Sequence, residues 1–292
     1  MSSHYIPATL SAAFSRFVGF RLIGQGGEGA VFSVWDLIRK ADLALKLMRD
    51  SGEADLGERF EHEYGILASA RSPRLVTVYE HGMAGVALGG EEVPHYWYTM
   101  EQCERSVRAV FSSMPLRWRV DAALQMVDAL ALLHAMGVAH RDIKPDNLFV
   151  VRGNQIKLGD FGLAKVKQSA GGCGSGMEVS RGSPPYLAPE RWSGLVTADW
   201  RPSDQYAAGV TIFELLSAGG APLDFGATRE SCYRAHWQGK VLPLWIPELG
   251  RASLPAVDSV LGRMLGKRPE WRYPDLAECK RELTAALAQD GV

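Results

Sequence analysis

The first hundred residues alternate short apolar segments with glycines and polar residues. Segments of this length, rich in branched and aromatic side chains and bounded by glycine, predict β-strands. They are residues 17–24 (FVGFRLIG), 30–36 (AVFSVWD), 43–48 (LALKLM), 74–82 (RLVTVYEHG) and 95–101 (HYWYTME). Residues 55–70 (DLGERFEHEYGILASA) instead have helical spacing. We expect the glycine-rich residues 83–94 to link the last two strands.

After about residue 103 the apolar period becomes helical. In residues 117–136 one stripe of a helix collects five apolar side chains, Val120, Leu124, Val127, Leu130 and Leu133. Gly137 follows as a C-terminal cap. Residues 204–219 predict a buried helix, and residues 253–265 and 273–289 predict amphipathic ones. The pattern therefore predicts a small β-rich unit followed by a larger, mainly helical one.

The composition limits the class of protein but does not indicate a function. The chain has 292 residues, of which 47% are hydrophobic and 22% charged, with a net charge of −1. Such a balance is typical of a globular protein and gives no reason to expect a nucleic-acid partner. No apolar segment is long enough to span a bilayer, and the N-terminus does not resemble a secretory signal. We expect a cytoplasmic protein; the oligomeric state and any further domains stay open.

The four cysteines lie far apart in the sequence, at Cys103, Cys173, Cys232 and Cys279. No CxxC pair occurs, and the seven histidines lack metal-ligand spacing. A zinc site or a disulfide framework is therefore not expected, and reduced thiols fit better.

The segment IGQGGEGAVF holds the first candidate chemistry. Gly24, Gly26 and Gly29 form GxGxxG, in which the backbone can approach a phosphate closely. A simple hairpin turn and a dinucleotide-binding loop share this spacing. A dinucleotide fold places the glycines between a strand and a helix, whereas here they lie between two predicted strands. We therefore expect a flap over phosphates.

Lys46 ends the strand-like LALK and can reach a nucleotide phosphate, although a surface lysine would look the same. A carboxylate on the next helix would hold the ammonium in place. We prefer Glu63 for this role over Glu53, Glu58 and Glu61, because the sequence turns apolar there. A solvated acidic helix face is the alternative.

The eight residues HRDIKPDN, at positions 140–147, carry dense charge, and Pro145 excludes a regular helix interior or central strand. A polar loop after a helix is the simplest interpretation. The chemistry suggests more: Asp142 can accept a proton from an attacking hydroxyl, and Lys144 can neutralise a phosphoryl group. Asn147 and Asp160, the latter in GDFG, offer the oxygen ligands that Mg²⁺ prefers.

The order of these motifs, followed by APE at residues 188–190, resembles a Hanks-type serine/threonine protein kinase of the bacterial style. The resemblance covers about residues 17–287. It implies an α+β, bilobal kinase fold over residues 17–290. The N-lobe would span about residues 17–100, the hinge 101–103 and the C-lobe 104–290.

The resemblance also implies roles for individual residues. Asp142 would be the catalytic base, Lys144 the phosphate-facing lysine, and Lys46 would pair with Glu63. Asn147 and Asp160 would hold Mg²⁺, or Mn²⁺ in its place. ATP would contact Gly24, Gln25, Gly26, Gly27, Glu28, Gly29, Val31, Ala44, Lys46, Met100, Glu101, Cys103 and Phe149. Leu67, Val78, His140 and Phe161 would stack as a regulatory spine, and Asp204 would anchor its base. Glu190 would pair with Arg272.

Regulation is implied by Arg141, which directly precedes the catalytic aspartate. With Lys165 and Arg59 it forms a basic set that a phosphate on Ser175 or Ser180 can bind. Ser183 is better interpreted as a structural hydroxyl near Asp142. The alternative is that these serines only solubilise a glycine-rich segment.

We therefore expect an ATP-dependent kinase that phosphorylates serine or threonine of proteins, including its own activation loop. Lys144 and GSPPY favour this over a tyrosine kinase. An acidic Glu28 at the tip of the glycine loop departs from the family pattern. The rivals are a pseudokinase scaffold that binds nucleotide and a small-molecule phosphotransferase, which would lack the APE segment and its Glu–Arg pair.

Overall fold

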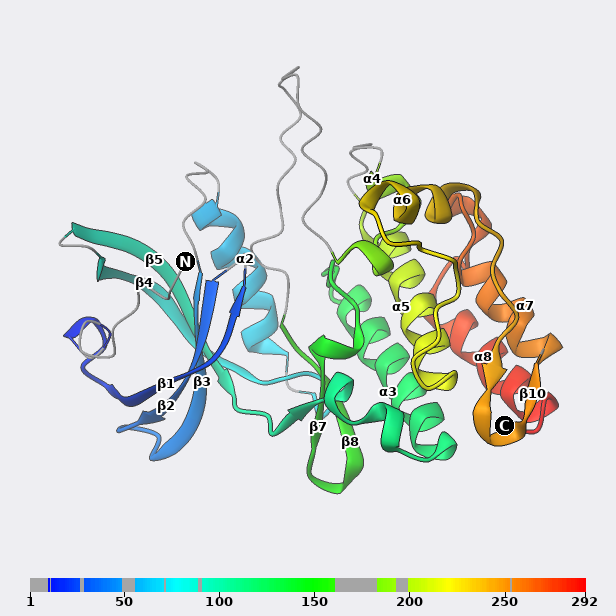
Figure 1. Cartoon of the computed structure of the whole chain (residues 1–292). Coiled ribbons are helices and arrows are strands. Elements are labelled where there is room, and N and C mark those ends of the chain that lie inside the picture. Colours follow the sequence, from blue (N-terminus) through cyan, green and yellow to red (C-terminus); the bar gives the residue numbers. More distant parts are fainter. Residues whose placement is uncertain are drawn as a thin grey trace, which may run out of the picture. The chain divides into compact units, whose positions relative to one another are not determined.

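The chain folds into two compact units, residues 1–103 and 104–292. The structure, a computed structural model (Figure 1), describes residues 10, 12–26, 29–48, 56–70, 72–88, 91–160, 183–192, 199–252 and 254–292.

The first unit contains an antiparallel sheet of five strands and the helix α2. Its elements are β1 (Phe17–Gly26), β2 (Gly29–Asp36), β3 (Ala41–Met48), α2 (Leu56–Ser69), β4 (Val78–Leu88) and β5 (Glu91–Glu101). The order in the sheet is β1-β2-β3-β5-β4. Helix α2 packs against β4 through its buried stripe of Phe60, Tyr64 and Leu67. The predicted strands and helix are confirmed, with shifted ends.

The prediction that residues 83–94 form a linker is wrong, because these residues extend β4 and β5 into one long hairpin. Gly85 pairs with Pro94, and Leu88 pairs with Glu91. The glycines and the proline hid the strand, since both residue types are depleted in sheets. Cross-strand pairing and the burial of Val86 override that local preference.

Residues before β1 belong to the core of the first unit. Leu10 and Phe14 are buried with Phe17 and Phe20. The Phe14 ring meets the edge of Trp97 at 5.4 Å between centroids. Arg16 binds the Asp36 carboxylate with two hydrogen bonds of 2.8 and 2.7 Å. This short segment is thus fixed to the sheet by apolar contact and by charge.

The second unit is mainly helical, with two small sheets of short strands, β6-β7-β8 and β9-β10. Its helices are α3 (Leu116–Ala135), α4 (Pro189–Trp192), α5 (Arg201–Leu216), α6 (Arg229–Gln238), α7 (Pro255–Met264) and α8 (Leu276–Gln289). Its strands are β6 (Arg105–Ser106), β7 (Leu148–Val151), β8 (Gln155–Leu158), β9 (Trp245–Ile246) and β10 (Arg251–Ala252). Helix α3 packs against α5, α8 and β8.

Helix α3 ends as predicted. Gly137 has φ +78°, and two bonds of 3.1 and 3.0 Å, from Gly137 N to His134 O and from Val138 N to Leu133 O, close a Schellman motif. The predicted stripe is only part of the buried surface: Val127, Leu130 and Leu133 are inaccessible, but Val120 and Leu124 are only partly buried. The cap thus ends α3 just before residues 140–147 and sets the direction in which the backbone enters them.

Helix α6 was missed, because its sequence RESCYRAHWQ is polar and has a weak apolar period. The available signal was its start. Thr228 and Ser231 form a capping box, in which each side chain hydrogen-bonds the backbone N–H of the other residue.

Candidate active site

The glycine-rich turn joins β1 to β2. Gly24 pairs with Val31, and Gly26 pairs with Gly29, so the predicted position between two strands is confirmed. Gly29 has φ +148°, and a Cβ there would lie 1.9 Å from the carbonyl oxygen of Leu47. Only glycine fits. The tip residues Gly27 and Glu28 lie outside the described residues.

Lys46 lies on β3, the middle strand of the sheet, between Val31 on β2 and Tyr98 on β5. Its side chain is only 5% exposed. A buried ammonium is unfavourable unless it binds a partner, so the position indicates function. Ala44, on the same strand, lies opposite Met100, and both are buried. These register positions place Val31, Ala44, Lys46 and Met100 in adjoining strands.

The residues after Met100 cross out of the sheet. Gln102 accepts a hydrogen bond of 3.0 Å from Ser33 Oγ. Glu101 N donates to Thr77 O at 2.8 Å, and Cys103 is partly exposed. The side chains of Glu63 and Arg59 lie outside the described part.

In the second unit, Asp204 on α5 anchors the segment that starts at His140. Its carboxylate accepts 2.7 Å bonds from the backbone N–H groups of His140 and Arg141. His134 Nε2 lies 3.0 Å from the same carboxylate. Arg141 has φ +70°, an uncommon conformation for a side-chain-bearing residue, which these bonds stabilise. The predicted anchoring role of Asp204 is confirmed.

His140 is buried and joins two parts of the site. Its Nε2 donates to Gly159 O at 3.0 Å, and its Nδ1 accepts from Asp142 N at 3.3 Å. A carbonyl can only accept, so the neutral tautomer with the proton on Nε2 satisfies both partners. The ring thereby ties the backbone of Asp142 to the residue just before Asp160.

The Asp142 carboxylate is held by two side chains. Asn147 Nδ2 donates to Asp142 Oδ2 at 2.9 Å and to its backbone oxygen at 2.7 Å. Lys144 Nζ lies 2.8 Å from the same Oδ2 and donates to Ser183 Oγ at 2.8 Å. Ser183 is thus linked to Asp142 through Lys144, as predicted. The structure brings a carboxylate, an amide, an ammonium and a hydroxyl together in one place.

Asn147 and Asp160 lie at the open end of the β7–β8 hairpin. Leu148 pairs with Leu158, and Gly159 N donates to Asn147 O at 3.0 Å. Asp160 has φ +57°. Phe149, on β7, pairs with Ser106 and Lys157. The hairpin brings an amide and a carboxylate that lie 13 residues apart into adjacent positions.

The donor set fits a hard divalent cation. Because Asn147 Nδ2 is turned to Asp142, the oxygen of that amide is the atom left for a metal. The Asp160 carboxylate is the second candidate ligand. In the described parts of the chain, no three His, Cys, Asp or Glu side chains gather as a metal site. Two oxygen ligands suit Mg²⁺, which keeps waters and phosphate oxygens in its shell.

Glu190 and Arg272 form the predicted ion pair. The guanidinium donates two hydrogen bonds of 2.8 Å to the two carboxylate oxygens, and Ser203 Oγ adds a third of 2.8 Å. Burial alone would raise the pKa of Glu190, but the Arg272 hydrogen bonds hold it below its ordinary value. The pair joins α4 to the segment before α8.

A further network fixes Tyr186. Its hydroxyl donates to Glu214 Oε2 at 2.6 Å and accepts from Arg108. Arg108 also binds Glu214 and, at 3.1 Å, Asp146 Oδ2. This network could not be predicted from the sequence: Tyr186 belongs to GSPPY, but nothing in the sequence singles out Arg108.

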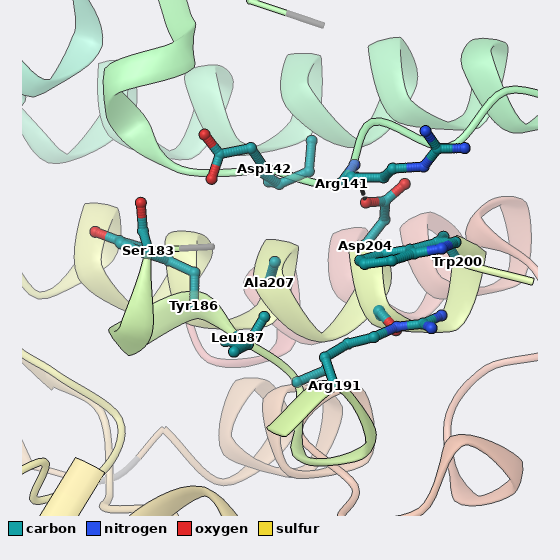
Figure 2. Close-up of a pocket in the computed structure, with 12 residues that line it drawn as sticks. Arg141, Asp142, Ser183, Tyr186, Leu187, Arg191, Trp200, Asp204 and Ala207 are labelled. Atoms are coloured by element: carbon teal, nitrogen blue, oxygen red, sulfur yellow. Dashed lines mark hydrogen bonds between the residues drawn. The ribbon is translucent and has the colours of Figure 1, made fainter. Parts of the chain in front are cut away.

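A narrow pocket lies between residues 141–143, the 183–188 segment and α5 (Figure 2). Arg141 and Arg191 approach Trp200 from opposite sides, with guanidinium carbons 5.7 and 3.8 Å from the ring centroid. The pocket volume of about 20 Å³ admits one water molecule and excludes an organic ligand. The proposed regulatory residues Ser175, Ser180 and Lys165 lie outside the described residues.

Comparison with known proteins identifies the family. The protein kinase domain model matches residues 17–270. The chain is 31% identical over 286 residues to the serine/threonine-protein kinase Pkn2 of Myxococcus xanthus, covering 94% of this chain and 33% of that protein. It is 29% identical over 273 residues to the serine/threonine-protein kinase PknB of Mycolicibacterium smegmatis, covering 90% of this chain and 41% of the relative. The chain thus spans between a third and a half of these relatives.

Solved structures show the same fold. The PknI kinase domain of Mycobacterium tuberculosis superposes with a TM-score of 0.66 at 22% identity, over 92% of this chain and 96% of that one. A β-rich unit that contains α2, followed by a mainly helical unit, confirms the predicted α+β kinase fold. The motifs, the fold and the family match agree, and the chain belongs to the protein kinase domain family.

Proposed function

We propose that the chain is an ATP-dependent kinase that phosphorylates serine or threonine residues of proteins. The observation that carries the proposal is the Asp142 carboxylate, held by Asn147 and Lys144 while Lys144 also binds Ser183. A scaffold that only binds nucleotide has no need of this arrangement. The bacterial serine/threonine kinases to which the chain is similar support the same activity.

Asp142 orients the attacking hydroxyl of the substrate and accepts its proton. Lys144 neutralises charge on the phosphoryl group during transfer, because its ammonium lies 2.8 Å from Asp142. Phosphoryl transfer needs positioning and charge stabilisation more than covalent help. Lys46 holds the phosphates of ATP and pairs with Glu63 of α2. All four roles are proposals based on position and chemistry.

ATP binds to the residues of the first unit that adjoin Lys46. The glycine-rich turn, Gly24 to Gly29, covers the phosphates, while Val31, Ala44 and Met100 line the adenine. Glu101 and Cys103 offer backbone groups to the adenine edge. Phe149, on β7, also stays a proposed contact of ATP. The support is the register of β1, β2, β3 and β5, which brings Val31, Ala44 and Met100 beside Lys46.

Protein kinases use ATP with a divalent cation. We infer that the cation is Mg²⁺, or Mn²⁺ in its place, and that the oxygen atoms of Asn147 and Asp160 hold it. When bound, the cation offsets the negative charge of the phosphates. These two oxygens would hold the cation near Asp142, because the Asn147 amide donates to the Asp142 carboxylate and the Asn147 backbone oxygen accepts from Gly159 N, next to Asp160.

Control by phosphorylation remains part of the proposal. A phosphate on Ser175 or Ser180 would bind Arg141 and Lys165 and draw Arg59 and Glu63 of α2 toward Lys46. Arg141 supports this because it lines an open hollow together with Trp200 and Arg201. A double variant, Ser175→Ala with Ser180→Ala, should retain ATP binding and lose activity compared with the phosphorylated wild type. Equal activity of the two would contradict it.

The extent and setting of the domain are also proposed. The family match ends at residue 270, but α8 packs on α3 and α7 with Leu283 and Leu287 buried. The kinase domain therefore runs from about residue 17 to 290. In the described part, no helix has the length and apolar character needed to cross a membrane. We place the chain in the cytoplasm, where its thiols stay reduced.

The test is transfer of radiolabelled phosphate from MgATP without added substrate, followed by mass-spectrometric mapping of the labelled residues. Label on serine or threonine of the wild type is expected. Asp142→Asn and Lys46→Met should nearly abolish it while the circular dichroism spectrum stays unchanged. ATP binding without any transfer would instead favour the scaffold.

A further inference from the structure

His236, on the helix that the sequence analysis missed, links two elements of the second unit. Its ring is completely buried. Nε2 lies 2.9 Å from Pro184 O, and Nδ1 lies 2.8 Å from the hydroxyl of Tyr206. Nothing in the proposed mechanism so far uses this residue.

The direction of both hydrogen bonds follows from their partners. The Pro184 carbonyl can only accept, so Nε2 carries the proton. Nδ1 then holds a lone pair and accepts from the Tyr206 hydroxyl. Aromatic rings of Trp192 and Phe225, at 5.8 and 5.0 Å between centroids, close the surroundings. The neutral imidazole is therefore held in one tautomer and one orientation.

Both hydrogen-bond partners of His236 connect it to residues 140–147, here called the catalytic stretch. Pro184 follows Ser183, whose hydroxyl binds Lys144 Nζ at 2.8 Å, and Lys144 contacts Asp142. Tyr206 lies on α5, two residues after Asp204, which anchors His140 and Arg141. His236 thus spans from the helix that anchors the catalytic stretch to the segment that contacts its lysine.

We propose that His236 is a positioning residue for phosphoryl transfer. By donating a hydrogen bond to Pro184 O, it fixes the start of the 184–186 turn. The Ser183 hydroxyl therefore keeps its hydrogen bond with Lys144 Nζ. Lys144 in turn stays beside Asp142. The inference rests on the proposed kinase function and deepens it. His236 touches no reacting group, and its effect passes through Pro184 and Ser183.

Two amide variants separate this role from simple packing. The side-chain nitrogen of glutamine can take the place of Nε2, so His236→Gln keeps the donor to Pro184. The oxygen of asparagine can take the place of Nδ1, so His236→Asn keeps the acceptor for Tyr206 and loses the donor. Each variant loses one of the two hydrogen bonds of His236. The two variants should therefore be destabilised by similar amounts.

The experiment measures kcat, the KM for ATP and the melting temperature of each variant. His236→Asn should lower kcat about tenfold, the equivalent of one lost hydrogen bond, with the KM for ATP unchanged. His236→Gln should stay within about twofold of wild type in kcat. Tyr206→Phe leaves the Pro184 bond intact, and it should lower the melting temperature more than kcat.

A double-variant cycle tests the route through Ser183. In a Ser183→Ala background the link to Lys144 is already absent, so His236→Asn should cause little further loss of kcat. Equal kcat losses in the Gln and Asn variants, or full additivity with Ser183→Ala, would overturn the inference while leaving the kinase function intact. A wild type that transfers no phosphate would overturn the proposed function, and this inference with it.

Discussion

At the residue scale, the charged and polar side chains of residues 140–147 bind one another and so keep each other's orientation. Asp142, Lys144 and Asn147 form contacts of 2.8 to 2.9 Å, and Asp204 fixes the backbone just before them. A carboxylate that is oriented before the substrate arrives requires no rearrangement during the reaction. Substitutions here should therefore cost rate more than stability.

Asp160 gives the sharpest case. Asp160→Asn removes the charged oxygen ligand proposed for Mg²⁺ and should lower kcat at least about a hundredfold. The control is Asp146→Asn, a nearby carboxylate that is half-exposed and pairs with Arg108, which should change kcat less than about threefold. Both are measured over a titration of Mg²⁺. Asp160→Asn matching wild type at every concentration would exclude Asp160 as a ligand.

The residue roles that could be predicted are those whose chemistry is local in sequence. HRDIKPDN and GDFG present their charged groups in short segments, and the hairpin of β7 and β8 then joins them. Lys46 was placed on a buried strand in the same way, whereas its pairing with Glu63 stays a prediction. His236 and Arg108 could not be found, because their importance arises from contacts 52 and 78 residues away in sequence, with Pro184 and Tyr186.

At the element scale, Gly137 determines where α3 stops and the catalytic stretch begins. Its φ of +78° is strained for any residue with a Cβ, although there is open space around it. Gly137→Ala should lower the free energy of unfolding by about 1 kcal/mol.

A matched control lies in α7. Gly262 sits inside that helix without a positive φ, and nothing lies within 4 Å of a Cβ built there. Gly262→Ala should raise the free energy of unfolding by about 0.5 to 1 kcal/mol. Urea unfolding of both variants checks the pair, and changes of the same sign would contradict the role assigned to Gly137.

Helix α6 should make the second unit sensitive to acid. Burial, together with the nearby Lys267 ammonium, outweighs the Pro184 hydrogen bond and lowers the pKa of His236 to about 4. The unfolded chain, with a histidine pKa of about 6.5, binds the proton more readily. Stability is therefore full above about pH 6.5 and falls as the pH drops toward 4, by on the order of 3 kcal/mol.

This acid sensitivity can be assigned to the single ring. In His236→Gln the decline between about pH 6.5 and 4 should flatten, whereas the loss caused by Glu190, whose pKa lies below its ordinary value, should remain at lower pH. Melting temperatures over this range test it. Parallel pH profiles for wild type and variant would assign the decline to other groups.

The elements were predicted best where apolar residues recur with a helical period, as in α3, or dominate the whole segment, as in α5 and β3. They were missed where tertiary pairing overrides local preference. Glycine and proline concealed the long β4–β5 hairpin, whose register is set by the neighbouring strand. Helix α6 has a polar sequence and is stabilised by its capping box and by a few buried side chains.

At the scale of the whole molecule, Glu190 and Arg272 join parts of the second unit that are 82 residues apart. Both side chains are buried, so Arg272→Met leaves a carboxylate without its partner and should cost about 3 to 5 kcal/mol. The double variant with Glu190→Gln removes both charges and should be less destabilised than Arg272→Met alone. Unfolding in urea, followed by tryptophan fluorescence, measures the three free energies. A double variant that is the least stable of the set would show that the charge is not the cause.

The buried residues before β1 bear on how this chain can be shortened. The family match begins at residue 17, but the hydrophobic core of the first unit begins earlier, with Leu10 and Phe14. A recombinant protein trimmed to the match would lose the aromatic cover of Phe17 and Trp97. It should melt at a lower temperature than one that starts at residue 9, because removing a buried phenylalanine costs about 3 kcal/mol or more. The trimmed protein would present that uncovered aromatic face to its neighbours in solution and tend to aggregate.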